Sequence, residues 1–243
     1  IPKLYADDIK IYTTIESNVD NDRLQQNIDR LVQWAHTWQL TVSIKKCQAM
    51  HTSRKRKHDA LMTCFHIDSE QLPAADIVRD LGVEVDANLT FSTHISHTVR
   101  KAMTRCYLLN RCFISRDNAT LVRAFKVYVR PILEYASSVW SPHLIKDIEL
   151  LESVQRRFTK LLPGMMNMSY TERLHYTGLE RLDICRLRSD LVLAYQMLFG
   201  LMSVDWSQFF QISHNTATRG HPFKLYTQAA HTDIRKYFFA NRL

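Results

Sequence analysis

Two adjacent acidic residues, Asp7 and Asp8, lie between two short runs of strand-forming residues near the start of the sequence. β-Structure disfavours aspartate and neighbouring carboxylates repel each other, so strand packing does not account for the pair. The flanking runs, IPKLY and IKIYTT, predict a β-hairpin over residues 1–14 with the aspartates at its tip. Neighbouring side chains of a straight strand point to opposite faces, whereas a tight turn lets two consecutive carboxylates approach one site.

Carboxylates paired in this way have a structural and a chemical explanation. Aspartate is common in turns because its side chain accepts hydrogen bonds from nearby backbone amides. Alternatively, the pair binds a divalent cation, since Mg²⁺ takes hard oxygen ligands and keeps waters and substrate phosphates in its remaining positions. Two-metal phosphoryl transfer needs carboxylates that bridge or flank both ions. The spacing of the two aspartates does not distinguish these explanations, so the choice between them depends on the surrounding sequence.

The elements that follow the aspartates predict a sheet with a helix packed on it. Asp20 and Asn21 are candidate N-caps of a helix over residues 21–38, whose apolar residues recur at helical spacing. We expect Trp34 and Trp38 on this helix to serve core or lid packing rather than to stack on bases. Strand-forming runs follow at LTVSI (40–44), CQAMHTS (47–53), MTCFHI (62–67) and LGVEVD (81–86). We therefore predict an antiparallel sheet with a packed helix over residues 1–90.

After residue 92 the pattern becomes helical. Apolar residues recur at alternating steps of four and three, which predicts one continuous buried stripe. They are Ile95, Val99, Ala102, Cys106, Leu109 and Phe113. Further helices are expected over residues 118–130, 147–162 and 183–203, with Pro131 ending or kinking the first of them.

Basic residues gather on the first two of these helices. Residues 92–133 hold eight lysines and arginines and a single acid, Asp117. A solvated helix face ordinarily mixes both signs of charge, so we favour a surface that follows nucleic-acid phosphates. The proposed contacts are Arg100, Lys101, Arg105 and Arg111 on the first helix and Arg123, Lys126 and Arg130 on the second.

Composition narrows the function classes. The net charge of +8 favours acidic partners such as nucleic acid, and no apolar run approaches the ~20 residues of a membrane span. Five cysteines without a CxxC pair argue against a disulfide framework and a zinc finger, and make a reducing intracellular location the default. His94 and His97 lie three residues apart without a third ligand in view, so we favour two solvated histidines over a metal site. The run RKRKH (54–58) reads as a nuclear address, a phosphate contact or a solvated hairpin tip.

Five stretches, in a common order over about 160 residues, resemble the reverse transcriptases of non-LTR (LINE-type) retrotransposons. They are YADD (5–8), LVQWAHTWQLTVSIKKCQAM (31–50), DLGVEVDANLTFSTHI (80–95), VYVRPILEYASSVWSP (127–142) and LESVQRRFTKLL (151–162). The first resembles the polymerase hairpin signature, and the second the helix, W-x-L turn and lysine-containing strand after it. The third is similar to the primer-gripping hairpin, and the last two to the thumb helices.

The resemblance implies an α+β fold in three segments. Residues 1–90 would form a partial polymerase palm, residues 91–165 a helical thumb, and residues 166–243 a helical C-terminal extension. The implied activity is RNA-directed DNA synthesis by two-metal nucleotidyl transfer in the full-length parent, with dNTPs as substrates. Mg²⁺ or Mn²⁺ would be the cofactor, and an RNA template with a DNA primer the partner. The lineage favours a nuclear over a cytoplasmic location.

The resemblance also implies roles for residues of the palm segment. Asp7 would be the metal ligand on the hairpin and Asp8 would assist at the second position, while Tyr5 and Ala6 would line the floor beside the primer end. Lys46 would lie near the phosphates of the incoming nucleotide, where a cation helps the leaving pyrophosphate. Lys45 is the neighbouring candidate for that role.

A second hairpin and the basic helices complete the implied site. Leu81 and Gly82 would lie in the hairpin that supports the primer terminus, since glycine permits close backbone approach. The basic helix faces would follow the template–primer backbone, which requires no base specificity.

One departure from the family concerns catalysis. Such polymerases need a further catalytic aspartate on a strand upstream of the hairpin, and the sequence begins with Ile1, six residues before Asp7. We therefore expect a fragment of a longer protein that does not polymerise DNA on its own. Three alternatives remain: a nucleic-acid-binding remnant without chemistry, the product of a decayed insertion, and an unrelated helical scaffold.

Overall fold

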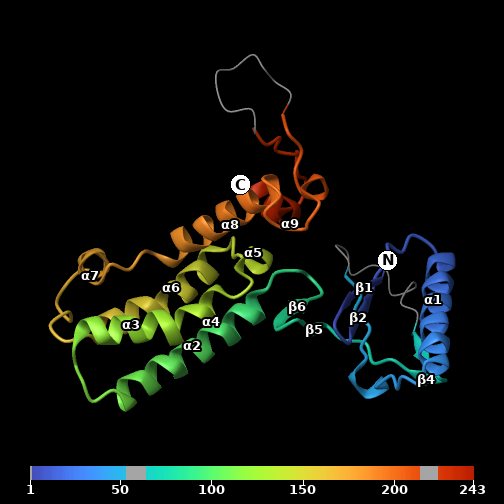
Figure 1. The fold of residues 1–243 in the computed structure, drawn as a ribbon, viewed down its shortest axis with the longest axis horizontal. Coiled ribbons are helices and arrows are strands. Elements are labelled where there is room, and N and C mark those ends of the chain that lie inside the picture. Colours follow the sequence, from blue (N-terminus) through green and yellow to red (C-terminus); the bar gives the residue numbers. More distant parts are fainter. Residues whose placement is uncertain (1, 53–63, 214–223) are drawn as a thin grey trace. The chain divides into compact units, whose positions relative to one another are not determined.

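A computed structural model of the chain describes residues 2–52, 64–213 and 224–243. The chain divides into two compact units, residues 1–89 and 90–243. The first unit contains the paired strands and one long helix, and the second is mainly helical (Figure 1). The predicted α+β fold is confirmed at the level of mixed helices and small antiparallel sheets. The palm and thumb assignments, and the boundary at residue 165, stay predictions.

The strands of the first unit form three separate antiparallel hairpins rather than one sheet. β1 (Pro2–Tyr5) pairs with β2 (Asp8–Ile11), β3 (His66–Ile67) with β4 (Glu70–Gln71), and β5 (Ile77–Asp80) with β6 (Val83–Asp86). The predicted hairpin within residues 1–14 is thus confirmed, and the strand predicted at 81–86 forms only over Val83–Asp86, as β6.

The strand predicted at 40–44 is wrong, and so is the one predicted at 47–53 over its described residues 47–52. Residues 40–43 have no regular structure, η1 (Ile44–Lys46) is a 3₁₀ turn, and Ala49 forms only an isolated bridge with Ala74. The apolar side chains of this segment, including Val42 and Ile44, pack against a core cluster that contains Ile28 and Val32. Burial against a helix therefore replaces the pairing that a strand would need.

α1 (Asn18–Thr37) is the helix on which the first unit packs. Its N-cap is Ser17 rather than the predicted Asp20 or Asn21. Asp20 instead reaches back from the first turn and accepts hydrogen bonds from the backbone nitrogens of Glu16 (3.1 Å) and Ser17 (3.0 Å). These bonds to the charged carboxylate lower the pKa of Asp20 below its usual value.

The tryptophans of α1 do not pack in the core, which was one of the two predicted roles. Trp34 is 50% exposed and Trp38 66% exposed. The buried positions Ile28, Val32 and Ala35 define the inner side of the helix. At 100° per residue Trp34 lies well away from that side, and Trp38 is the C-cap residue where the helix ends.

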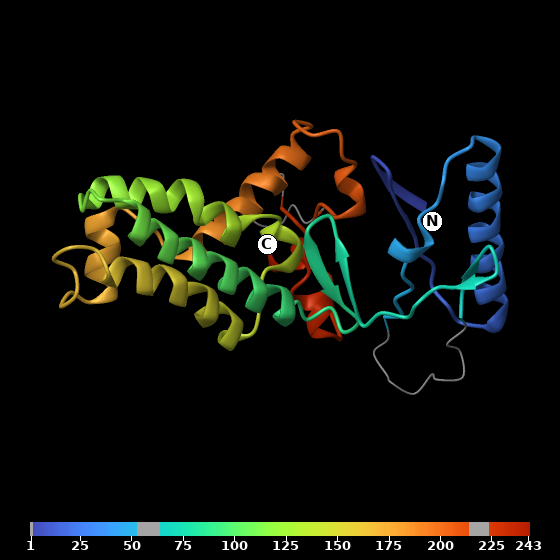
Figure 2. The ribbon, with the colours of Figure 1, turned by 90° about the horizontal axis from the view of Figure 1, so that it is seen from below.

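The second unit is built from helices. They are α2 (Ser92–Cys112), α3 (Asn118–Tyr128), α4 (Arg130–Glu134), α5 (Ser137–Trp140), α6 (Ile145–Lys160), α7 (Tyr170–Thr177), α8 (Leu182–Leu198), α9 (Asp233–Lys236) and α10 (Phe239–Arg242), with a 3₁₀ turn η3 (Trp206–Gln208) between α8 and α9. Figures 1 and 2 show α2, α3, α4 and α6 side by side. Pro131 lies in the first turn of α4, after α3 has ended, as the sequence predicts.

The predicted stripe of α2 forms the core of this unit. Ile95, Val99, Ala102, Cys106 and Leu109 are all buried. Between α3 and α6, the rings of Phe125 and Phe158 stack with centroids 4.2 Å apart.

The prediction of two solvated histidines is wrong for His94. His97 is exposed, whereas His94 is buried and its ring packs edge-on against Trp140, with centroids 5.2 Å apart. His94 faces inward because it directly precedes Ile95 on the buried side of α2.

A second cluster lies where α8 meets α10 and the segment around Phe210. Ala194 and Met197 of α8 pack with Phe210 and Phe239. Beside this cluster Arg242 donates two hydrogen bonds to the buried Asp190 carboxylate, at 2.8 and 3.0 Å, and one to the Ser138 carbonyl at 2.8 Å. An ion pair thus joins α10 to α8.

Candidate functional site

The β1–β2 register places the two aspartates at different positions of one tight turn. Tyr5 pairs with Asp8, so the loop consists of Ala6 and Asp7 alone. Ala6 has a φ of +52°, the left-handed conformation that the favoured two-residue hairpin loops require at their first position. Asp7 is therefore a loop residue and Asp8 the first residue of β2, and both are exposed.

The hairpin predicted to support a primer terminus has a loop of similar construction. Leu81 and Gly82 connect β5 to β6, with φ values of +45° and +88°. Two positive φ values are the signature of a type I′ turn, in which Gly82 is favourable and Leu81 is not. The two residues that the resemblance places in this hairpin thus form its loop, and the strand begins only after them, at Val83.

An ion pair joins the two hairpins, and sequence reasoning missed it. Lys10 on β2 donates to the Asp80 carboxylate at the end of β5, directly before the Leu81–Gly82 loop. Lys10 lies two residues after Asp8, so the side chains of Asp8 and Lys10 share a face of β2. The pair therefore ties the aspartate-bearing strand to the second loop. The two-residue spacing of Asp8 and Lys10 predicts that their side chains share a face of the strand. Nothing in the sequence indicates that Asp80 is the partner of Lys10.

Lys46 lies on a different element from the aspartates. It is the last residue of η1, and both Lys45 and Lys46 are exposed. No ion pair that the structure describes joins Lys46 to Asp7 or Asp8. The structure therefore leaves Lys46 free to meet a ligand but does not bring it into contact with the carboxylates.

The carboxylate pair has the chemistry of a hard-cation ligand. Mg²⁺ is commonly held by one or two carboxylates, with waters and substrate phosphates in the other positions, and Asp7 and Asp8 match that donor set. Within residues 2–52, 64–213 and 224–243, no group of three or more His, Cys, Asp or Glu side chains is placed to hold a metal ion. The described residues thus fit one ion shared with a substrate and do not supply a second complete set of ligands.

Most of the predicted basic contacts lie on exposed helix surfaces. Arg100, Lys101, Arg105 and Arg111 of α2 and Arg123 and Lys126 of α3 are all exposed. The Arg111 guanidinium also lies over the Tyr107 ring, 5.7 Å from its centroid, and Tyr107 is itself 62% exposed. α2 thus presents cations and an aromatic ring to solvent.

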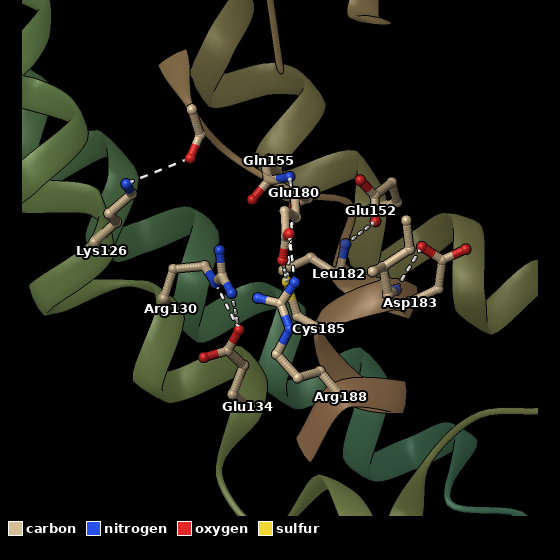
Figure 3. A network of polar contacts seen from close by, with 12 residues as sticks. Lys126, Arg130, Glu134, Glu152, Gln155, Glu180, Leu182, Asp183, Cys185 and Arg188 are labelled. Carbon is tan, nitrogen blue, oxygen red and sulfur yellow. Dashed lines mark hydrogen bonds and ion pairs between the residues drawn. The ribbon is translucent and has the colours of Figure 1, made fainter. Parts of the chain in front are cut away.

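The prediction that Arg130 shares this exposed surface is wrong. Its side chain is 15% exposed and forms an ion pair with Glu134, four residues along (Figure 3). Arg130 is the first residue of α4, where the chain has changed direction after α3, so the spacing from Lys126 no longer keeps it on the same face. Lys126 remains exposed, with its ammonium 3.5 Å from the Gly178 carbonyl oxygen.

A polar network that the sequence did not indicate joins α6, α7 and α8, and Figure 3 shows its residues Glu152, Gln155, Glu180 and Leu182. Glu152 is almost fully buried and accepts hydrogen bonds from the Tyr170 hydroxyl and from the Leu182 backbone nitrogen (2.9 Å). Gln155, also buried, donates to the Tyr170 hydroxyl (3.1 Å) and to the Glu180 carbonyl (2.8 Å). Burial, together with the bond to Glu152, raises the pKa of Tyr170 above its usual range. These bonds link α6 with α7 and with the start of α8, although the buried Oε1 of Gln155 accepts no hydrogen bond from the described residues.

The basic run at 54–58 lies outside the described residues.

Two polymerases of mobile elements are similar to this chain. The RNA-directed DNA polymerase from mobile element jockey of Drosophila funebris is 26% identical over 166 residues, and the probable RNA-directed DNA polymerase from transposon X-element of Drosophila melanogaster is 23% identical over 168 residues. The chain resembles non-LTR retrotransposon reverse transcriptases. The resemblance predicted from YADD and the four later stretches is thereby confirmed.

The extent of these matches limits what they show. Each covers 66% of this chain but only 18% of the polymerase. An uncharacterized protein of Caenorhabditis elegans is 29% identical over 126 residues, which is 51% of this chain and 64% of that protein. No protein-family profile and no solved structure matches the chain. In the part of the chain that the structure describes, no helix is long and apolar enough to cross a membrane.

Proposed function

We propose that this chain is part of a reverse transcriptase of the non-LTR retrotransposon kind, and that it serves RNA-directed DNA synthesis by two-metal nucleotidyl transfer. One observation carries the proposal. In a chain similar to RNA-directed DNA polymerases, Asp7 lies in a two-residue hairpin loop, and the Lys10–Asp80 ion pair ties that hairpin to the Leu81–Gly82 loop. Residues 1–90 would act as part of the palm and residues 91–165 as the thumb.

In this proposal the two loops and Lys46 have separate tasks. Asp7, assisted by Asp8, would hold Mg²⁺ or Mn²⁺, which when bound neutralises charge that develops on the phosphates. The Leu81–Gly82 backbone would support the primer end, since Gly82 has no side chain to obstruct close approach. Lys46, exposed and unpaired with the aspartates, would meet the phosphates of the incoming dNTP.

The exposed cations of α2 and α3 would hold an RNA template–DNA primer duplex by its phosphates. Six of the seven predicted basic residues are exposed and suit this task, whereas Arg130 is neutralised by Glu134 and is not included. A nuclear location would follow from the lineage.

We expect the 243-residue chain alone to show no polymerase activity. Its described residues gather no third carboxylate at the hairpin, and two-metal catalysis needs ligands for two ions. Primer extension on an RNA template with a DNA primer, dNTPs and Mg²⁺ or Mn²⁺ measures this. Asp7→Asn is the matched control, because it removes the charge and keeps the shape. Synthesis that depends on both the metal and Asp7 would overturn the expectation.

Duplex binding without catalysis is a second candidate function, favoured by the exposed basic surface of α2. We expect the chain to bind a labelled RNA–DNA duplex at low salt and to release it as salt rises. The double charge reversal Arg100→Glu/Arg105→Glu should weaken binding at least tenfold and flatten the salt dependence.

A control separates a local surface from overall charge. Arg23→Glu/Arg30→Glu on α1 changes the net charge equally at two exposed positions outside α2. We expect it to weaken binding much less. No binding at low salt, or an equal loss in both variants, would contradict a role for α2.

A further inference from the structure

A hollow of about 310 Å³ lies between α2 and α6, which run side by side in Figure 1. Its floor is buried, since Cys106 and Phe158 are 6% and 1% exposed, whereas Tyr107 and Leu161 at its rim are 62% and 59% exposed. The other lining residues are Met103, Thr104, Asn110, Val154 and Arg157. A cavity of roughly 150 Å³ holds benzene, so this hollow has room for a larger flat ring system.

The α2 side of the hollow continues into positive charge. Counted at about 100° per residue from the buried Cys106, Asn110 lies about 40° and Tyr107 about 100° around the helix. Arg100 and Arg111 follow in the same direction, at about 120° and 140°. The Arg111 guanidinium lies over the Tyr107 ring, 5.7 Å from its centroid. The lining residues of α2 and these two arginines therefore form one continuous side of the helix.

α6 supplies cations at the opposite rim. Counted in the same way from Phe158, Leu161 lies about 60°, Arg157 about 100° and Lys160 about 160° around the helix, all in one direction. Burial raises the pKa of the Cys106 thiol and the charge of Arg157 acts against that rise, so this guanidinium lies near the floor of the hollow. The exposed rim cations are Arg100, Arg111, Arg157 and Lys160.

No acidic side chain balances the rim cations. α2 contains neither aspartate nor glutamate. The three acids of α6 are engaged elsewhere, Asp147 with Ser92, Glu149 with Arg156 and Glu152 with Tyr170. In the part of the chain that the structure describes, no ion pair includes a rim cation. The hollow is thus an apolar space bordered on both sides by uncompensated positive charge.

This combination identifies the chemistry of the ligand. A nucleotide carries a flat base beside a phosphate, and the hollow offers Tyr107 for stacking, the Asn110 amide for hydrogen bonds to a base edge, and cations for the phosphate. An apolar side chain of a protein partner would leave the amide without a hydrogen bond and would make no use of the cations. A base that is paired in a duplex is stacked and has to be extruded before it can enter such a space, whereas an unpaired base requires the least energy.

We propose that the hollow between α2 and α6 receives one unpaired base of a nucleic-acid strand, while the rim cations bind the phosphates beside it. This inference rests on the nucleic-acid binding in the proposed function. It adds a preference, because contacts to duplex phosphates alone do not distinguish an unpaired nucleotide from its paired neighbours.

Fluorescence anisotropy with three labelled RNA–DNA duplexes tests the preference of the 243-residue chain. One is fully paired, one carries a single unpaired adenosine in the RNA strand, and one carries an abasic site at that unpaired position. We expect the unpaired adenosine to tighten binding about fivefold or more, which is the lower end of what stacking of one base contributes. The abasic duplex should bind like the fully paired one. Equal affinity of the adenosine and abasic duplexes would overturn the proposal.

Substitutions in the hollow test its location. Tyr107→Ala and Asn110→Leu leave the charge unchanged, and each should bring the ratio of the affinities for the unpaired-adenosine and fully paired duplexes to about one. Tyr176→Ala on α7 is the matched control, because Tyr176 is 65% exposed and lies outside the hollow. It should keep the ratio, and circular dichroism shows whether each variant keeps its helices. A ratio that both hollow variants retain, or that the control loses equally, would overturn the proposal.

The three duplexes also separate this inference from the proposed function. Salt-dependent binding of the fully paired duplex, without any gain from the unpaired adenosine, would refute the inference and leave duplex binding intact. No binding of any of the three at low salt would refute both. Adenosine monophosphate that binds as tightly as the unpaired-adenosine duplex would assign the hollow to free nucleotides and overturn its assignment to a strand.

Discussion

At the tip of the first hairpin, Ala6 adopts a φ of +52°, which residues other than glycine, asparagine and aspartate rarely do. The left-handed conformation costs roughly 1–2 kcal/mol, so the β1–β2 pairing on both sides has to hold it. Backbone strain of this kind concentrates at sites where the direction of a neighbouring group matters. Here that neighbour is Asp7, the residue to which we assign the metal.

Residue types predicted the positions of the turns correctly, but they did not predict which polar side chains would be buried. Asp7 was predicted at a hairpin tip and is a loop residue, and Leu81 and Gly82 were predicted in a second hairpin, of which they form the loop. His94 and Arg130 were predicted at the surface and lie inside or half-buried. Their environments depend on Trp140 and Glu134 and on the direction the chain takes after Tyr128, which no local spacing reveals.

The thiol of Cys106 provides a prediction at this scale. It lines a hollow of about 310 Å³ between α2 and α6, and burial raises its pKa from 9.0 to about 12. The folded state therefore binds this proton more tightly than the unfolded state. The stability it contributes is complete below pH 9 and is lost as pH rises through 12.

We expect Cys106 to be alkylated by iodoacetamide at pH 8 at least 100-fold more slowly than an ordinary cysteine, because about 1,000-fold less of it is thiolate. Peptide mass spectrometry measures the rate, with exposed Cys112 as the internal control. Comparable rates at the two residues under native conditions would show that burial does not control this thiol.

Among the elements, the long helices and the first hairpin were predicted closely, whereas the strands at 40–44 and 47–53 were not. The α2 stripe contains enough turns for its period to be unambiguous, and its first five predicted positions are buried. The 40–44 and 47–53 runs are each five to seven residues long, too short for periodicity to distinguish a strand from an irregular segment packed on a helix. Their apolar residues are used by the α1 cluster instead.

The Lys10–Asp80 ion pair gives a prediction at the scale of the hairpins. Lys10 pairs across β1–β2 with Lys3, and like charges directly opposite are unfavourable, so Asp80 offsets a repulsion as well as linking two elements. Side chains that are 53% and 31% exposed give a modest energy, and we expect a coupling of about 0.5 kcal/mol. A double-mutant cycle of Lys10→Ala and Asp80→Ala in urea denaturation measures it.

The charge-swapped variant Lys10→Asp/Asp80→Lys is the control for the cycle. It should be more stable than the single reversal Asp80→Lys, which leaves two cations facing each other. Lys10→Asp alone is measured beside it, because that change also places an acid opposite Lys3. Additive losses with no recovery would mean that the hairpins are held together without this pair.

At the scale of the whole chain, each unit has its own core, and the second is closed by the ion pair between Arg242 and Asp190. The Asp190 side chain is 3% exposed and that of Arg242 is 14% exposed. Removing one member of a buried pair leaves the other charge unpaired away from water, which is more costly than losing the pair as a whole.

We expect Arg242→Ala to destabilise the second unit by roughly 3–5 kcal/mol and Arg242→Ala/Asp190→Asn to lose clearly less. Guanidinium denaturation followed by far-ultraviolet circular dichroism measures both, because this unit holds most of the helices. Arg235→Ala is the control, since Arg235 is exposed and should change stability by less than about 0.5 kcal/mol. Equal losses at Arg235 and Arg242 would show that α10 is not anchored by Asp190.

The two-residue loop of the first hairpin has a consequence for the gene that encodes it. A codon inserted or deleted between Tyr5 and Asp8 would either change the loop length or slip β2 by one position against β1. A slip of one residue moves every side chain of a strand to the other face, which would carry Lys10 away from Asp80. Codon substitutions along β1 are compatible with this geometry, because its side chains are exposed, whereas in-frame indels are not. Related sequences that keep this hairpin should therefore differ by substitutions in β1 but not in the number of residues between Tyr5 and Asp8.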